Sequence, residues 1–141
     1  MSVCILSGGF DPLHVGHLRM IQEAVDTFKY VVVGVNSEEW LIRKKGAAFM
    51  PLEERCEIIR GIEGVTDVLT FNDEDGTAKD LIKKVVESGV YGYDVYFGNG
   101  GDRTDENVPE QKLCDELFVD LVWGLGGGKV QSSSSLIEGA K

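Results

Sequence analysis

The sequence has few residues of the types that build disulfide frameworks or zinc sites. Its 141 residues include three cysteines and two histidines, and Cys4, Cys56 and Cys114 stand far apart. An odd number of widely spaced cysteines favours neither a disulfide framework nor a zinc site. We therefore expect three buried free thiols.

Long apolar segments and an excess of basic residues are also missing. No run approaches the roughly 20 apolar residues that a membrane span needs, and the N-terminus lacks the basic start and long apolar region of a signal peptide. We expect a cytoplasmic protein with no membrane partner. The formal net charge of −10 argues against a nucleic-acid partner, because such proteins carry a basic face. A small phosphorylated ligand remains compatible with this net charge, because salt screens interactions between exposed charges that lie more than about 10 Å apart.

The remaining composition is that of one folded domain. A hydrophobic content of 43% and a charged content of 27% are ordinary for globular proteins. The length suits a single core. With no internal repeat and no dividing linker, we expect residues 1–141 to form one domain.

Short apolar segments alternate with segments of helical spacing along the chain. The expected strands are 3–6, 30–35, 65–71, 94–97 and 118–123. The expected helices are 17–28, 51–61, 77–88, 109–117 and 132–137. This alternation predicts an α/β fold, a Rossmann-like three-layer sandwich with a five-stranded parallel sheet covered on both faces.

Three glycine-bearing loops follow strands of the predicted sheet, at residues 8–17, 98–104 and 124–135. Ligands of such sheets bind beyond the carboxyl ends of the strands. We therefore expect the three loops to share one edge, which would hold both histidines of the chain.

The segment His14-Val15-Gly16-His17 carries the clearest functional signal. Two rings at positions i and i+3 can face the same side of a helix start, and the unpaired N–H groups there attract anions. Gly16 would let a phosphate approach the backbone. Two solvated histidines or a partial metal site are the alternatives, but zinc would need a third ligand. We expect a phosphate site.

Two other phosphate-binding motifs are excluded. Residues 124–129 resemble a P-loop, but the spacing is wrong and Val130 stands where a Ser or Thr would bind Mg²⁺. No G-x-G-x-x-G motif follows the first expected strand, so we do not expect a nicotinamide dehydrogenase.

Residues 9–17 (GFDPLHVGH) resemble the signature of the HxGH nucleotidylyltransferase superfamily, in particular its cytidylyltransferase-like family. Residues 35–38 (VNSE), 50–55 (MPLEER) and 100–102 (GGD) follow in that family's order, so the resemblance spans nearly the whole chain. Within the family, the chain is similar to glycerol-3-phosphate cytidylyltransferases and to adenylyltransferase domains acting on heptose 1-phosphate.

The resemblance implies catalytic roles for four residues. His14 and His17 would hold the α-phosphate of a nucleoside triphosphate and stabilise the charge that develops during attack. Lys44 would face the phosphates, and Arg55 would face substrate phosphate. Without the resemblance, residues 43–45 could be a solvated charge run, and Arg55 could pair with an acid at i,i+4. The implied substrate-binding residues are Lys45, Arg55 and Arg103.

The resemblance also implies a set of nucleotide contacts. They are Gly8, Gly9, Phe10, Asp11, His14, Gly16, His17, Gly100, Gly101, Asp102, Lys129, Gln131, Ser132, Ser133 and Ser134. The glycines near residue 100 could instead form a surface turn, and the serine run could be a flexible tail, although serine is favoured at helix N-caps. Lys129 stands near where the family has an arginine, and lysine cannot make the bidentate contact. The choice of base therefore stays open.

The sequence thus predicts a nucleotidyltransferase that moves AMP or CMP from a triphosphate to a phosphorylated small acceptor, of the sugar phosphate or glycerol 3-phosphate type. Pyrophosphate would leave, and Mg²⁺ would accompany the triphosphate. The resemblance implies a homodimer as the common assembly. The alternative is a nucleotide-binding module of the same fold that has lost turnover.

Overall fold

The computed structural model describes residues 2–100 and 108–126. The strands are β1 (Ser2–Gly8), β2 (Tyr30–Val35), β3 (Asp67–Thr70), β4 (Asp94–Gly100) and β5 (Asp120–Leu125). The helices are α1 (Val15–Thr27), α2 (Glu38–Lys45), α3 (Leu52–Arg60), α4 (Lys79–Ser88) and α5 (Gln111–Glu116).

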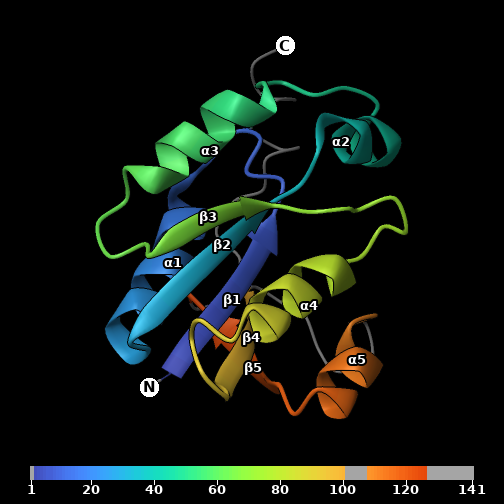
Figure 1. The fold of residues 1–141 in the computed structure, drawn as a ribbon. Helices are drawn as coiled ribbons and strands as arrows, with labels where there is room; N and C mark the ends of the chain where they lie inside the picture. The colour runs from blue at the N-terminus through green and yellow to red at the C-terminus, as the bar shows by residue number, and fades with distance from the viewer. Residues whose placement is uncertain (1, 101–107, 127–141) are drawn as a thin grey trace.

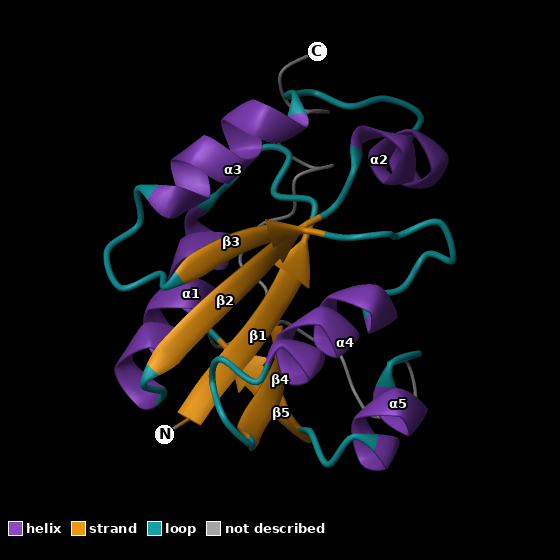
Figure 2. Ribbon diagram, in the orientation of Figure 1, coloured by secondary structure: helices purple, strands orange, loops and turns teal. Residues whose placement is uncertain are grey.

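All five strands form one parallel sheet in the order β3-β2-β1-β4-β5. The predicted Rossmann-like α/β fold is confirmed (Figure 2). Because the strands are parallel, their carboxyl ends share one edge, and α2 lies beyond the arrowheads of β1 and β2 (Figure 1). The order reverses between β1 and β4, which is where sheets of this kind bind ligands.

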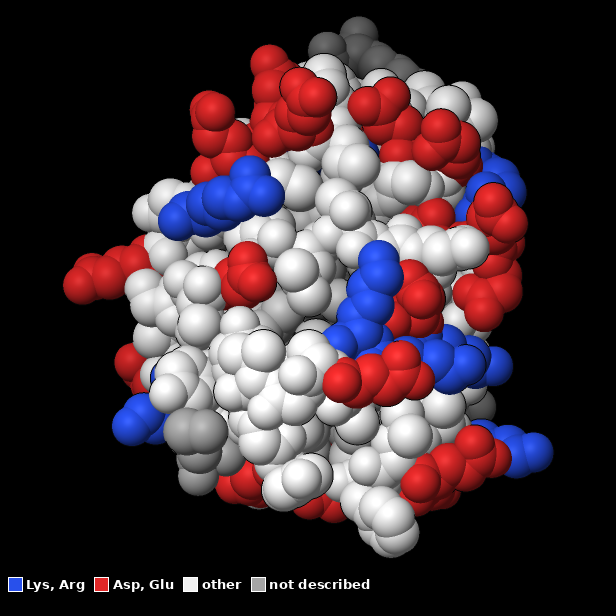
Figure 3. All heavy atoms as spheres, in the orientation of Figure 1, with Lys and Arg blue, Asp and Glu red and all other residues white. Residues whose placement is uncertain are grey.

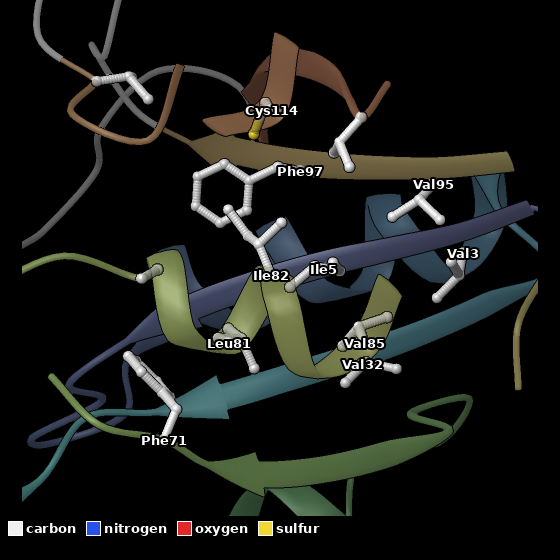
Figure 4. Packing of buried hydrophobic residues seen from close by; sticks show 13 residues of the cluster. Val3, Ile5, Val32, Phe71, Leu81, Ile82, Val85, Val95, Phe97 and Cys114 are labelled. Atoms are coloured by element: carbon white, nitrogen blue, oxygen red, sulfur yellow. The ribbon is translucent and has the colours of Figure 1, made fainter. Parts of the chain in front are cut away.

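Alternate residues of β1 pack into two separate cores. Val3 and Ile5 join the core under α4 and α5, whereas Cys4 and Leu6 join the core under α1 and α3. Figure 4 shows Ile82 of α4 over the first of these cores. Side chains on both faces of β1 are fully buried, as expected for a central strand covered by helices on each side.

A glycine in β2 lets one helix approach the sheet closely. A Cβ atom on Gly34 would collide with the side chain of Leu81, which is fully buried in α4. Any larger residue at position 34 would therefore push α4 away from the strand.

Helix α2 is absent from the sequence-based prediction. Ser37 caps it by accepting the N–H of Trp40, and Gly46 ends it with a left-handed φ of +89°. Only Leu41 of this helix is buried, so its residues carry no apolar stripe that periodicity could detect. The capping residues Ser37 and Gly46 are the signal that was available.

Other element boundaries also differ from the prediction. Strand β4 runs to Gly100, so residues 98–100 are strand and not loop as expected. Strand β5 begins at Asp120, because Phe118 has a positive φ of +59° that no extended strand allows. The predicted helix 132–137 lies outside the described residues.

The three cysteines are free and buried, as predicted. Burial raises the pKa of Cys4 and of Cys114 to about 12, so both stay thiols at neutral pH. No helix within residues 2–100 and 108–126 is long and apolar enough to cross a bilayer. In Figure 3, lysine and arginine side chains lie scattered among acidic ones on the visible face and form no continuous basic surface.

Candidate active site

The two histidines lie at the start of α1, directly after the turn that follows β1. His14 is the N-cap, and its Nδ1 accepts the N–H of Gly16 at 3.0 Å. In return, the Nδ1 of His17 accepts the N–H of His14 at 3.2 Å. The rings stack with their centroids 3.8 Å apart and an interplanar angle of 22°. The expectation that both rings face one side of the helix start is confirmed.

These hydrogen bonds determine where the proton of each neutral ring sits. A nitrogen that accepts a backbone N–H carries no proton, so both neutral rings hold theirs on Nε2. Burial lowers the pKa of His17 to about 4, helped by the nearby charges of His14 and Lys45. His17 is therefore neutral at pH 7 and carries an Nε2–H donor.

The cap changes one detail of the sequence-based prediction. The helix start was expected to offer unpaired N–H groups to an anion, but the N–H of Gly16 is bound to His14. The neutral ring of His17 adds an Nε2–H donor at this turn. Phe10 supports the His17 ring, since its own buried ring meets it edge-on at 4.9 Å.

Asp11 is buried and binds the loop between α2 and α3. Its carboxylate accepts the N–H groups of Phe49 and Met50, each at 2.6 Å. Lys45 donates to the Asp11 carbonyl at 2.7 Å and lies 3.7 Å from its carboxylate. Asp11 was expected to contact nucleotide, but its described contacts instead hold this loop against the histidine turn.

The two lysines singled out in the sequence have different settings. The charge of Lys45 acts on His17, and its side chain is only 15% exposed. The ammonium of Lys44 lies over the ring of Trp40, 4.5 Å from its centroid, and its side chain is exposed. Lys45 therefore adds positive charge beside His17, and the expectation that Lys44 faces the phosphates stays a prediction.

Arg55 has a different setting from the one expected for a phosphate-facing residue. It is 1% exposed, and burial lowers its pKa. Its Nη1 donates to the carbonyls of Gly9 and Asn36 at 2.9 and 2.7 Å, and its Nε donates to the carbonyl of Met50 at 3.0 Å. Only Nη2 has no hydrogen-bond partner. Arg55 thus ties three loops of the site together.

Four of the glycines predicted to contact the nucleotide, Gly8, Gly9, Gly16 and Gly100, lie within the described residues. A Cβ on Gly9 would lie 2.8 Å from Leu41 and 3.3 Å from Trp40, so the turn packs closely on α2. A Cβ on Gly8 would lie 3.1 Å from the ring of Phe10. Gly100 ends β4, where a side chain would meet Met20.

Two buried carboxylates near the sheet were not predicted from the sequence. Asp73 follows β3, is buried, and accepts from the side chain of Asn36 and from the backbone and hydroxyl of Ser37. Glu110 is buried and accepts the N–H of Ala78, which precedes α4. Both carboxylates bind segments distant in sequence, so no local motif identifies them.

A hollow of about 390 Å³ opens beside α2. Its lining residues are Ser37, Glu39, Arg43, Phe71, Asn72, Asp73 and Glu74. Three carboxylates face a single guanidinium there, so the hollow is ill suited to a triphosphate. It includes neither histidine.

The remaining predicted site residues lie outside the described residues. They are Gly101, Asp102, Arg103, Lys129, Gln131, Ser132, Ser133 and Ser134.

No group of three or more His, Cys, Asp or Glu side chains in residues 2–100 and 108–126 could hold a metal ion. The buried carboxylate of Asp11 already binds two amides and lies beside Lys45. Mg²⁺ in nucleotide sites is held largely by substrate phosphates and water. The described residues therefore fit Mg²⁺ only as part of the triphosphate substrate.

Comparisons with known proteins identify the family of this chain. Residues 5–139 match the cytidylyltransferase-like family. The chain is 32% identical over 126 residues to the bifunctional protein HldE of Sulfurimonas denitrificans. The aligned part covers 86% of this chain and 24% of that relative. It is 28% identical over 103 residues to the ethanolamine-phosphate cytidylyltransferase of Mus musculus, covering 73% of this chain and 26% of that protein. The chain thus spans about a quarter of the length of these relatives.

A solved structure shows the same fold. The lipopolysaccharide core biosynthesis protein of Thermoplasma volcanium superposes with a TM-score of 0.65 at 21% identity, covering 87% of this chain and 95% of that one.

Proposed function

Because the chain belongs to the cytidylyltransferase-like family of nucleotidyltransferases, we propose that it moves AMP or CMP from a nucleoside triphosphate to a small phosphorylated acceptor. One observation carries the proposal. Two stacked imidazoles at the carboxyl edge of the sheet each have Nδ1 bound to backbone, so each neutral ring carries its proton on Nε2. Paired N–H donors of this kind suit the oxygens of an α-phosphate.

In the proposed reaction, a phosphate oxygen of the acceptor attacks the α-phosphorus of the triphosphate. The new P–O bond forms while the bond to the β-phosphate oxygen breaks, and Mg²⁺-bound pyrophosphate leaves. Both reactants arrive preformed, so the chain forms no covalent intermediate. Its task is to position the reactants and to stabilise charge.

The roles of individual residues follow from their settings. His14 and His17 donate hydrogen bonds from Nε2–H to the α-phosphate. Neither ring has to gain or lose a proton during turnover. Lys45 adds positive charge beside His17. Arg55 holds the loops that surround the phosphates, and Asp11 keeps the segment around Phe49 against the turn. Gly100–Asp102, Arg103, Lys129 and the serine run complete the nucleotide and acceptor contacts in this proposal.

Similarity to HldE, whose nucleotidyltransferase domain is a heptose 1-phosphate adenylyltransferase, favours ATP and a sugar phosphate. The mouse relative favours CTP and a phosphorylated alcohol, which is the second candidate. Both share one chemistry, a phosphate monoester that attacks an α-phosphorus.

The test is pyrophosphate release from each of the four ribonucleoside triphosphates with Mg²⁺. Each is combined with heptose 1-phosphate, glycerol 3-phosphate or ethanolamine phosphate. Release that requires both one triphosphate and one acceptor supports the proposal, and the active pair identifies the base. Triphosphate binding measured by calorimetry, without release for any pair, would instead support a binding module that has lost turnover.

A further inference from the structure

Asp73 is a buried carboxylate outside the histidine turn that binds the segment between β2 and α2. It lies in the loop after β3 and is 4% exposed. Its Oδ2 accepts the side-chain N–H of Asn36 at 3.0 Å and the backbone N–H of Ser37 at 2.8 Å. Its Oδ1 accepts the hydroxyl of Ser37 at 2.7 Å. The carboxylate therefore binds the two residues that connect β2 to α2.

The contact with Ser37 sets the start of α2. Because the Ser37 hydroxyl donates its proton to Asp73, a lone pair of the same oxygen is oriented to accept the N–H of Trp40 at 3.1 Å. The Asp73 carbonyl accepts a guanidinium N–H of Arg43 at 2.7 Å, one turn further along. One residue of the β3 loop thus binds both the cap and the last turn of this helix.

Helix α2 depends on contacts with other parts of the chain. It has eight residues, and Leu41 is its only buried one. Isolated helices shorter than about 12–15 residues are marginal in water. Tertiary contacts, including those of Asp73 at its N-terminus, therefore stabilise this helix.

The same helix forms part of the candidate active site. Leu41 and Trp40 press against Gly9 of the histidine turn. Lys45, in the last turn, reaches Asp11 and acts on His17. A shift of α2 would therefore move the wall beside Gly9 and the positive charge beside the histidines together.

We propose that Asp73 is a positioning residue that keeps Lys45 beside the histidine pair by fixing the start of α2. Its action passes through the helix, from Ser37 at one end to Lys45 at the other. This inference rests on the proposed function only for its effect on turnover, since the placement of Lys45 is a property of the protein without substrate.

The test measures the titration of His17 in the ligand-free protein. The chain has two histidines, so proton NMR shows two imidazole signals that His14→Asn assigns. Lys45 lowers the pKa of His17, so Lys45→Met should raise it and give the reference shift. Asp73→Ala should also raise the pKa of His17. The double variant should show the same pKa as Lys45→Met alone. In each titration, the pH falls from 7 until His17 begins to protonate.

The direction of the shift separates positioning from a direct charge effect. Losing a nearby carboxylate lowers the pKa of an imidazole, whereas losing a nearby ammonium raises it. A rise on removing Asp73 therefore reports that Lys45 has moved. Asp73→Asn, which keeps the volume of the side chain, gives the same readout if the alanine variant folds poorly.

Asp75→Ala is the matched control, because Asp75 lies in the same loop and its carboxylate hydrogen-bonds to Thr77 of that loop, not to the residues that connect β2 to α2 among those described. We expect its His17 titration to match wild type. The proposal is wrong if Lys45→Met raises the pKa of His17 but neither Asp73 variant does, so that this pKa stays at its wild-type value or falls in both. A wild-type titration in Lys45→Met would also overturn it. Neither result depends on turnover, so the pyrophosphate assay tests the proposed function separately.

Discussion

The rings of His14 and His17 stack at 3.8 Å, and each binds a backbone N–H of the same helical turn through Nδ1. The turn therefore holds two imidazoles in one tautomer before any substrate arrives. Two cations at this separation would repel each other, which agrees with the low pKa of His17. With a pKa of about 4, His17 is neutral at pH 7, so it is suited to donating a hydrogen bond and unsuited to holding a second proton near neutral pH.

Replacing His17 by alanine should lower kcat with little change in the KM for triphosphate. Removing one donor that acts mainly in the transition state typically costs about 10²–10³ in rate. The measurement is steady-state pyrophosphate release with the active pair of substrates. Arg19→Ala, an exposed change on the same helix, serves as the control and should keep wild-type kinetics. A His17→Ala activity within about threefold of wild type would remove His17 from the chemistry.

The low pKa of His17 predicts that stability depends on pH. Its folded-state pKa is about 4 and its ordinary value is 6.5, so the unfolded chain binds a proton that the folded chain does not bind between these values. Stability from this group is complete above pH 6.5 and is lost as pH falls toward 4. The expected loss is on the order of 1–3 kcal/mol.

Urea unfolding at several pH values between 7 and 4.5 measures this loss. His17→Gln removes the titrating ring, so its free energy of unfolding should fall less over the same range. Carboxylates elsewhere titrate in both proteins and cancel in the comparison. Parallel pH profiles for the two proteins would mean that His17 titrates normally.

The alternation of apolar strands and helices was enough to predict the parallel sheet, because the central strands β1 and β2 hold runs of consecutive buried residues. It missed α2, whose single buried residue Leu41 leaves no periodic pattern. The motif identified Asp11 and Arg55 as important without showing what they bind. Their partners are backbone groups of distant loops, such as the amide of Phe49 and the carbonyl of Gly9. A linear pattern does not record which loops meet.

Replacing Asp11 by alanine should destabilise the protein. Two short charge-assisted hydrogen bonds to Phe49 and Met50 would be lost, and Lys45 would lose its ionic partner. Hydrogen bonds to charged groups contribute about 1.5–3 kcal/mol each, so we expect a loss of at least about 2 kcal/mol. Thermal unfolding at pH 7 measures it.

Asp67→Ala is the control for the Asp11 variant, because Asp67 is an exposed acid whose side chain binds only its neighbour Val68. Its Tm should stay close to wild type. Equal Tm values for Asp11→Ala and wild type would show that the loop around Phe49 is held by other contacts.

Replacing Arg55 by lysine separates two roles for this residue. The guanidinium reaches the carbonyls of Gly9, Asn36 and Met50 at once, and an ammonium lacks the planar fork that makes this geometry possible. If Arg55 holds the loops together, the variant should lose about 2 kcal/mol or more, which lowers Tm by roughly 4–8 °C. Activity should then fall together with stability.

The control for this change is Arg60→Lys, an exposed position at the end of the same helix α3. It makes the same chemical change without touching the three carbonyls, so its Tm and kinetics should match wild type. A phosphate-facing arginine gives a different pattern in Arg55→Lys, in which kcat/KM falls about tenfold or more while Tm stays unchanged. Arg55 is 1% exposed and donates three hydrogen bonds to backbone carbonyls, so we expect the loss of stability. An unchanged Tm with a lower kcat/KM would instead indicate that Arg55 faces the substrate phosphate.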